Sequence, residues 1–207
     1  HFGVRLLDVK WYTAIVNEFF AACAVLLGIA GNIPYIRDIF RGRVQPHAYT
    51  WFVWSIVSGI TLFGQIAKGA GIGAAPTAVA ELFTIGIFLL SLRYGLKGIR
   101  RTDSIYLIVA LCGIGVWYLT KDPTYSVMIA VSIDVIAFIP TLRRARAQPP
   151  TETPLLYGSN VVRHMCSLAS LEAYNIATTL HSIAMLIMNS TMVTMLLVSR
   201  RNARQVR

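Results

Sequence analysis

The chain has 207 residues, of which 56% are hydrophobic and only 14% are charged, with 19 Lys and Arg against 9 Asp and Glu. A net charge of +10 would by itself suggest a nucleic-acid-binding protein, but soluble domains carry about 25% charged residues. Together with a mean hydropathy of +0.61, these values exclude a disordered basic tail, a disulfide scaffold and an ordinary soluble domain. They predict an all-α membrane protein that lies in the lipid bilayer and has no nucleic acid as a partner.

Seven stretches are long and apolar enough to predict membrane-spanning helices, since such a helix needs about 20 mostly apolar residues. In chain order the predicted helices cover Thr13 to Ile36, Tyr49 to Ala67, Gly73 to Leu92, Ser104 to Thr120, Thr124 to Leu142, Pro154 to Tyr174, and Asn175 to Ser199. The sixth contains Arg163, His164 and Glu172, so an amphipathic helix on the membrane surface is its alternative. No signal peptide stands out, and a chain that begins at His1 is expected to be a fragment or a processed form.

The basic residues predict the orientation, because cytoplasmic loops carry an excess of Lys and Arg. Fourteen of them fall on one side of the seven helices, in the 1–2, 3–4 and 5–6 loops and the carboxyl-terminal segment. The other side has four, which are Arg5, Lys10, Lys68 and Lys121. We therefore expect the amino terminus outside and the carboxyl terminus, with a basic tail over residues 201–207, in the cytoplasm.

An internal repeat relates the two halves of the chain. Ile-Pro occurs at Pro34 and again 106 residues later at Pro140, and Gln-Pro follows each copy at Pro46 and Pro149. LLSLR, which ends at Arg93, also resembles LLVSR 107 residues later. The repeat predicts a three-helix bundle over residues 13–100, a linker helix over 101–121 and a second bundle over 122–200. One linker helix between the copies makes the repeats parallel, a 3+1+3 arrangement.

This arrangement, with a proline near the inner end of helices 1 and 5 and a basic loop after each, resembles the PQ-loop superfamily that includes the SWEET and SemiSWEET sugar transporters. The stretch GNIPYIRDIFRGRVQPHAYTWFVW is more closely similar to an uncharacterised bacterial family of small integral membrane proteins. At the name-giving Pro-Gln positions this chain has Pro34-Tyr35 and Pro140-Thr141. The resemblance implies a bacterial inner-membrane transporter, in which Pro34 and Pro140 act as hinges for alternating access. The alternative is that both prolines only end the straight part of a helix.

Three ionisable residues are predicted near the membrane midplane: Glu81, Asp134 and Arg163. Ionised groups at this depth are costly, so they normally face the bundle interior and find partners. We expect Asp134 to pair with Arg163, and Glu81 to face them from the first bundle as a proton carrier or substrate ligand. The alternative is a structural ion pair with a silent, protonated Glu81.

Further polar residues are candidates to line the same cavity: Gln65, Asn160, His164, His181, Asn189 and Ser190. The resemblance implies substrate contact for Asn189, because helix 7 of the resembled transporters has an Asn that binds substrate. Trp51 and Trp54 are expected as interfacial anchors, with stacking in the pore as the alternative. No Walker loop, HExxH, GxSxG or CxxC motif occurs, so we expect neither an enzyme nor a cofactor or metal site.

These features predict a transporter of a small polar solute, such as a sugar or an amino acid, that works by alternating access and for which Glu81 allows proton coupling. Two alternatives remain on the same fold: a membrane receptor or sensor that does not transport, and a structural subunit of a larger complex. A homo-oligomer is also an open alternative.

Overall fold

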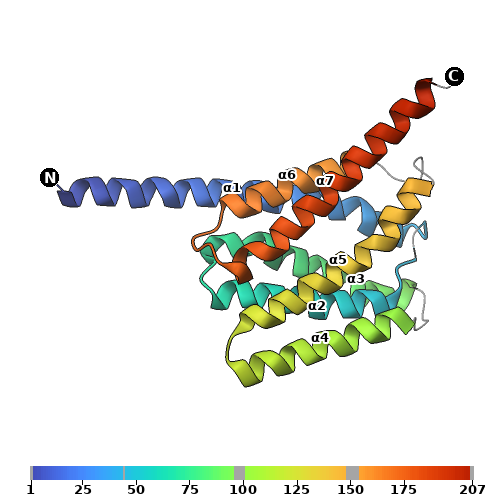
Figure 1. Ribbon diagram of the computed structural model, residues 1–207, viewed down its shortest axis with the longest axis horizontal. Coiled ribbons are helices and arrows are strands. Elements are labelled where there is room, and N and C mark those ends of the chain that lie inside the picture. Colours follow the sequence, from blue (N-terminus) through green and yellow to red (C-terminus); the bar gives the residue numbers. More distant parts are fainter. Residues whose placement is uncertain (1, 44, 96–100, 148–153, 206–207) are drawn as a thin grey trace.

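The computed structural model describes residues 2–43, 45–95, 101–147 and 154–205. Over these residues the protein is all-helical, with seven α-helices and one short 3-10 helix (Figure 1). Their bounds are α1 Phe2–Phe40, α2 Ala48–Ala67, η1 Gly71–Ala74, α3 Ala75–Tyr94, α4 Arg101–Thr120, α5 Pro123–Ala147, α6 Pro154–Ala169 and α7 Ile176–Gln205.

Four stretches in these helices are long and apolar enough to cross a membrane: Trp11–Phe40, Ala48–Ala67, Gly71–Tyr94 and Ile176–Ser199. α4 and α5 contain shorter apolar stretches, and α6 has only 16 residues. Large apolar side chains such as Phe63, Leu82 and Leu119 are more than 60% exposed, which a water-soluble surface tolerates poorly. The apolar helices indicate an integral membrane protein.

Several predicted helix limits are corrected: α5 continues to Ala147 instead of ending at Leu142, and α7 continues to Gln205 instead of ending at Ser199. α1 begins at Phe2 instead of Thr13 and continues past Pro34 to Phe40, so its 39 residues extend over about 58 Å and its first turns project beyond the bundle (Figure 1). Trp11 and Tyr12 on this projecting part are 71% and 72% exposed. The carboxyl-terminal end of α6 also differs from the prediction: this helix ends at Ala169, five residues before the expected Tyr174.

The first three and the last three helices pack in the same order. α3 packs against both α1 and α2, and α7 packs against both α5 and α6. Between the two sets, α1 packs against α6 and α2 packs against α5, while α4 lies on α5 and α2 (Figure 1). The two sets of three helices are therefore in contact through two helix pairs, α1 with α6 and α2 with α5.

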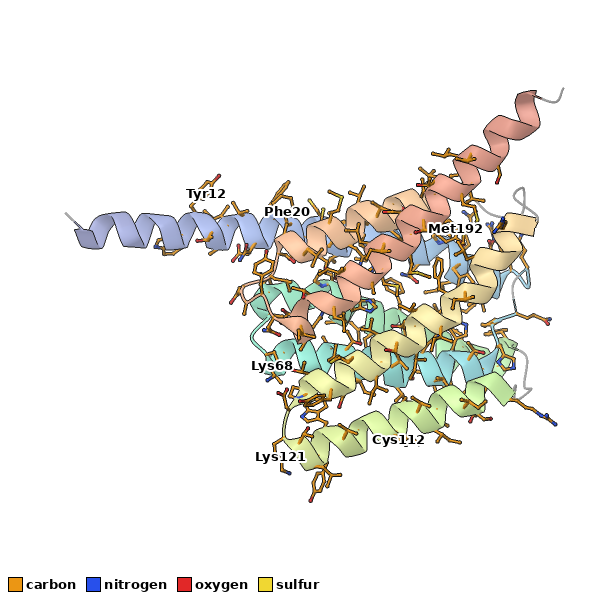
Figure 2. All side chains as sticks on the ribbon, viewed as in Figure 1. Tyr12, Phe20, Lys68, Cys112, Lys121 and Met192 are labelled. Atoms are coloured by element: carbon orange, nitrogen blue, oxygen red, sulfur yellow. The ribbon has the colours of Figure 1, made fainter. Side chains whose placement is uncertain are left out.

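The apolar core is divided among these contacts. The largest cluster joins α2, α4 and α5 through Val53, Val57, Ile60, Ala110, Ala130 and Ile133. A second joins α6 and α7 around Tyr157, Met192 and Leu196 (Figure 2). These clusters fix the helices that carry the polar residues described below.

At one end of the bundle, which we call the Lys68 end, the segments 68–74, 121–122 and 170–175 meet; Lys68 and Lys121 mark it in Figure 2. Glu172 Oε1 accepts a hydrogen bond from the backbone N–H of Ile72 (3.0 Å), and the Asn175 side chain donates to the Lys68 carbonyl (2.9 Å). The segment between α2 and α3 is thus held against the segment between α6 and α7.

Acid should weaken this end through Asp122. Its Oδ1 accepts a hydrogen bond from the backbone N–H of Thr124 (2.9 Å) and lies 2.9 Å from Lys68 Nζ. The hydrogen bonds to Thr124, and then Lys68, lower the pKa of Asp122 to about 2. An unfolded Asp has a pKa of about 3.9, so this stabilisation is complete above that pH and is lost as the pH falls through about 2.

We therefore expect the thermal midpoint of the wild-type protein in detergent to fall more steeply between pH 4 and pH 2 than that of Asp122→Asn. The Asn variant keeps a side-chain oxygen for Thr124 but has no titrating carboxylate at this position. Identical pH profiles of the two proteins would contradict the assignment.

Candidate functional site

A polar cavity of about 160 Å³ lies between α2 and α3 on one side and α5, α6 and α7 on the other. Its ionisable lining residues are Asp134, Arg163 and His181. Its hydroxyl-bearing lining residues are Ser58, Thr61, Thr77, Thr84 and Ser167. Trp54, Pro76 and Ala80 complete the wall. We call this space the polar cavity.

The polar cavity reaches the middle of the helices. Asp134 is eleven residues after Pro123, the first residue of α5, which places it about 16 Å along that helix. Arg163 is nine residues after Pro154, the first residue of α6, or about 13 Å along. Both residues therefore lie in the middle part of their helices, and both line the same space.

The expected Asp134–Arg163 ion pair is not formed. The ionisable residue next to Asp134 is His181, with Oδ2 3.5 Å from Nδ1, whereas Arg163 Nη2 donates a hydrogen bond to His164 Nε2 (2.9 Å). The two histidine rings lie edge to face with their centroids 5.6 Å apart. α7 packs against both α5 and α6, so each charged group lies beside a histidine and the two charged groups do not contact each other.

The Arg163–His164 contact defines the protonation of His164. An arginine only donates hydrogen bonds, so His164 Nε2 is the acceptor and carries no proton. His164 is therefore in the neutral form, with its proton on Nδ1. Its side chain is 3% exposed, which agrees with an uncharged ring among helices.

Arg163 reaches the polar cavity along α1. A Cβ atom built on Gly28 would lie 3.7 Å from Arg163 Cδ, so the aliphatic part of this side chain rests against the bare backbone of α1. The Arg163 Nε is buried and has no hydrogen-bond partner within the described part of the chain.

Glu81 lies against α2 instead of facing Asp134 and Arg163 across the cavity. Its carboxyl group lies beside the Ser58 side chain, and its Oε1 would be 3.6 Å from a Cβ atom on Gly59. Its Oε2 is buried and has no partner among the described residues. Glu81 is thus connected to the polar cavity through Ser58, which lines it.

The other predicted residues lie outside the lining of the polar cavity. Gln65 is fully buried and donates to the Thr178 carbonyl (3.4 Å). Asn189 donates to the Met185 carbonyl of its own helix (2.7 Å), and Asn160 is half-buried on α6.

The two hinge candidates both fall inside helices. Pro34 lies in α1 without ending it, and because proline has no N–H, the carbonyl of Ala30 lacks its helical donor. Pro140 lies within α5, and its side chain falls outside the described residues. A hinge role for either residue remains a prediction.

Most residues that line the polar cavity were not among the predicted site residues. The hydroxyl groups gave no signal because Ser and Thr in apolar helices commonly bond to a carbonyl one turn earlier, as Thr61 does to Val57 (3.1 Å) and Thr84 does to Ala80 (2.9 Å). Trp54 lines the polar cavity, which favours the alternative of a role in the pore over that of an interfacial anchor.

A larger groove of about 990 Å³ runs between α1 and α3 and is lined by apolar residues such as Ile33, Leu82 and Leu89. Its wall offers a ligand almost no polar group. Among the described residues, no three His, Cys, Asp or Glu side chains come together as metal ligands.

No family model, curated protein or solved structure matches this chain. The interpretation of the polar cavity therefore depends on its own residues.

Proposed function

We propose that the protein transports a small polar solute across a bacterial inner membrane by alternating access around the polar cavity. The observation that carries the proposal is that this cavity is lined by both sets of three helices, with ionisable and hydroxyl side chains inside an otherwise apolar helical protein. Ionisable groups inside a membrane cost free energy, and where they occur they commonly mark a path for a substrate or an ion.

We further propose the 3+1+3 arrangement of two parallel repeats. It is supported by the equivalent packing of α3 between α1 and α2 and of α7 between α5 and α6. The exchanged contacts, α1 with α6 and α2 with α5, are those expected of two copies related by a two-fold axis. Lys68 and Asn175, which are hydrogen-bonded to each other, are separated by the same 107 residues as the LLSLR and LLVSR segments.

In the proposed orientation the Lys68 end faces outward. The opposite end and the carboxyl-terminal segment carry fourteen of the nineteen Lys and Arg residues, which is typical of a cytoplasmic face. The resemblance to the PQ-loop superfamily is part of the proposal, and it leaves the solute open.

Uptake of a panel of sugars, amino acids and other polar metabolites into proteoliposomes tests the proposal. We expect flux of at least one solute, and a reduction of about tenfold or more in Thr84→Phe, since overpacking of 1–3 kcal/mol in the cavity corresponds to that factor. Ile85→Phe is the matched control, because Ile85 is the next residue on α3, is 40% exposed and does not line the polar cavity.

Absence of flux for every solute would overturn the transport proposal. Tight binding of one solute without flux would instead indicate a receptor. Equal flux in the Thr84→Phe and Ile85→Phe variants would place the transport path outside the polar cavity.

Proton coupling is tested by Glu81→Gln. If Glu81 carries the proton, uptake driven by an inward proton gradient falls to the level of uptake without a gradient, while exchange of internal for external solute persists. Glu18→Gln is the control, because Glu18 is exposed on α1. Gradient-driven uptake by Glu81→Gln at the wild-type level would exclude Glu81 as the proton carrier and leave the fold untouched.

A further inference from the structure

The guanidinium of Arg163 lies at the polar cavity without a counter-ion from the described residues. No carboxylate oxygen among them lies within 4.0 Å of it, and the hydrogen-bond partner of Nη2 is the neutral ring of His164. Its Nε is buried and unpaired in this part of the chain. A buried cation without an anion costs several kcal/mol, so an anionic group on a ligand is what this wall of the cavity lacks.

A negative group is available on a different helix of the same cavity. Asp134 lines it, and its contact with His181 is 3.5 Å, longer than the 2.7–3.2 Å typical of an N–H···O hydrogen bond. This carboxylate therefore retains capacity to accept hydrogen bonds from a ligand. Because Asp134 and Arg163 are more than 4.0 Å apart, a ligand fits between them without displacing an existing ion pair.

The wall around these charges suits an ammonium group as well. Trp54 lines the cavity, and a cation close to the face of an indole ring is stabilised by its quadrupole. Ser58 and Thr77 add hydroxyl groups that accept hydrogen bonds.

The volume limits the size of the ligand. A space of about 160 Å³ holds about five water molecules at ~30 Å³ each, whereas pockets for drug-sized ligands measure about 300–1,000 Å³. The polar cavity is smaller than such pockets, which favours a small solute.

We propose that the polar cavity binds a small zwitterionic α-amino acid, of the size of glycine or alanine, with its carboxylate on Arg163 and its ammonium group toward Asp134 and Trp54. The inference rests on the transport function proposed above, for which it names the class of solute. A monocarboxylate fits only the Arg163 side of the site, a simple amine fits only the Asp134 side, and a polyol fits neither charge.

The test is ligand binding to the full chain in detergent, measured by isothermal titration calorimetry with alanine, propionate, ethylamine, glycerol and glucose. We expect alanine to bind, and propionate and ethylamine to bind about 10- to 100-fold more weakly, since a hydrogen bond to a charged group contributes about that factor. Arg163→Met and Asp134→Asn should each weaken alanine binding by a similar factor. Arg37→Met is the matched control, because Arg37 is exposed on α1.

The ligand selectivity of the two variants distinguishes the contribution of Arg163 from that of Asp134. Arg163→Met should still prefer ethylamine to propionate, and Asp134→Asn should show the reverse preference. Where Arg163→Met fails to fold, Arg163→Lys, which keeps the charge but loses the planar group, replaces it, and the comparison of alanine with propionate and ethylamine in the wild-type protein remains decisive.

Three outcomes would overturn the inference: propionate or ethylamine binding as tightly as alanine, alanine binding unchanged by both substitutions, or glucose binding where alanine does not. Uptake separates this inference from the proposed function. Flux of a sugar but not of alanine would reject the amino acid and keep transport, whereas alanine binding without flux of any solute would keep the site and reject transport.

Discussion

Replacing Gly73 with alanine is expected to lower the free energy of unfolding by about 3 kcal/mol, at the upper end of the usual range for overpacking. A Cβ atom at this position would lie 2.7 Å from Leu171 Cα, 2.8 Å from Leu171 Cδ2 and 2.9 Å from the Ser170 carbonyl oxygen. Two of these are backbone atoms, which cannot rotate away as a side chain does. The segment 170–175 must therefore move off η1, and the hydrogen bond from Ile72 to Glu172 is lost with it.

Unfolding in mixed detergent micelles measures this loss, and hydrogen exchange locates it. In Gly73→Ala we expect faster exchange of the amides in residues 68–74 and 170–175 and unchanged exchange in α4. Gly86→Ala is the control, because a Cβ atom on Gly86 meets nothing within 4 Å. That variant should be as stable as the wild type or up to about 1 kcal/mol more stable, since alanine is the better helix former. Equal stability of the two variants would refute the close contact at Gly73.

Gly64→Ala should destabilise the contact between α2 and α5 by up to about 2 kcal/mol. A Cβ atom on Gly64 would overlap Val127 Cγ2, and Val127 is fully buried and β-branched, so it has no free rotamer to adopt. The overpacking cost of about 1–3 kcal/mol exceeds the gain of about 1 kcal/mol in helix propensity.

A double-mutant cycle with Val127→Ala isolates this contact. The second substitution removes the overlapping methyl group, so the two changes should be less destabilising together than their sum, with a coupling energy of at least ~0.5 kcal/mol. Gly115→Ala on the exposed side of α4, where a Cβ atom meets nothing within 4 Å, is expected to show no such coupling. Additive effects of Gly64→Ala and Val127→Ala would contradict the overlap.

The sequence predicted helices better than helix ends. α2 and α3 begin and end near the expected residues because long apolar runs there are bounded by charged or turn residues, whereas α7 continues past Ser199 through its basic residues to Gln205. A charge scan, however, locates membrane-crossing stretches and not helices, so it missed the eleven residues of α1 before Thr13, where charges interrupt the apolar run without breaking the helix. In α6, no Gly or Pro marks the end at Ala169.

The sequence predicts how far along its helix each residue of the candidate site lies, but it does not predict which side chains that residue contacts. Asp134 and Arg163 line one cavity because a residue number gives the height of a side chain along a helix. Which side chain lies within 4 Å depends on the rotation of each helix about its axis, which changes by 100° per residue and is set by tertiary packing. That is why Asp134 meets His181 and Glu81 meets Ser58.

The exchanged packing of α1 on α6 and of α2 on α5 has a mechanical consequence. The two sets of three helices contact each other along two seams, which are the α1–α6 and α2–α5 interfaces. The first contains Gly28 and Arg163, and the second contains Gly64 and Val127. A rigid movement of one set of helices against the other must shift both interfaces at once, so the helices cannot slide at one interface while the other stays fixed. A single covalent staple across either seam would therefore immobilise the whole molecule, including the cavity wall that lies between them.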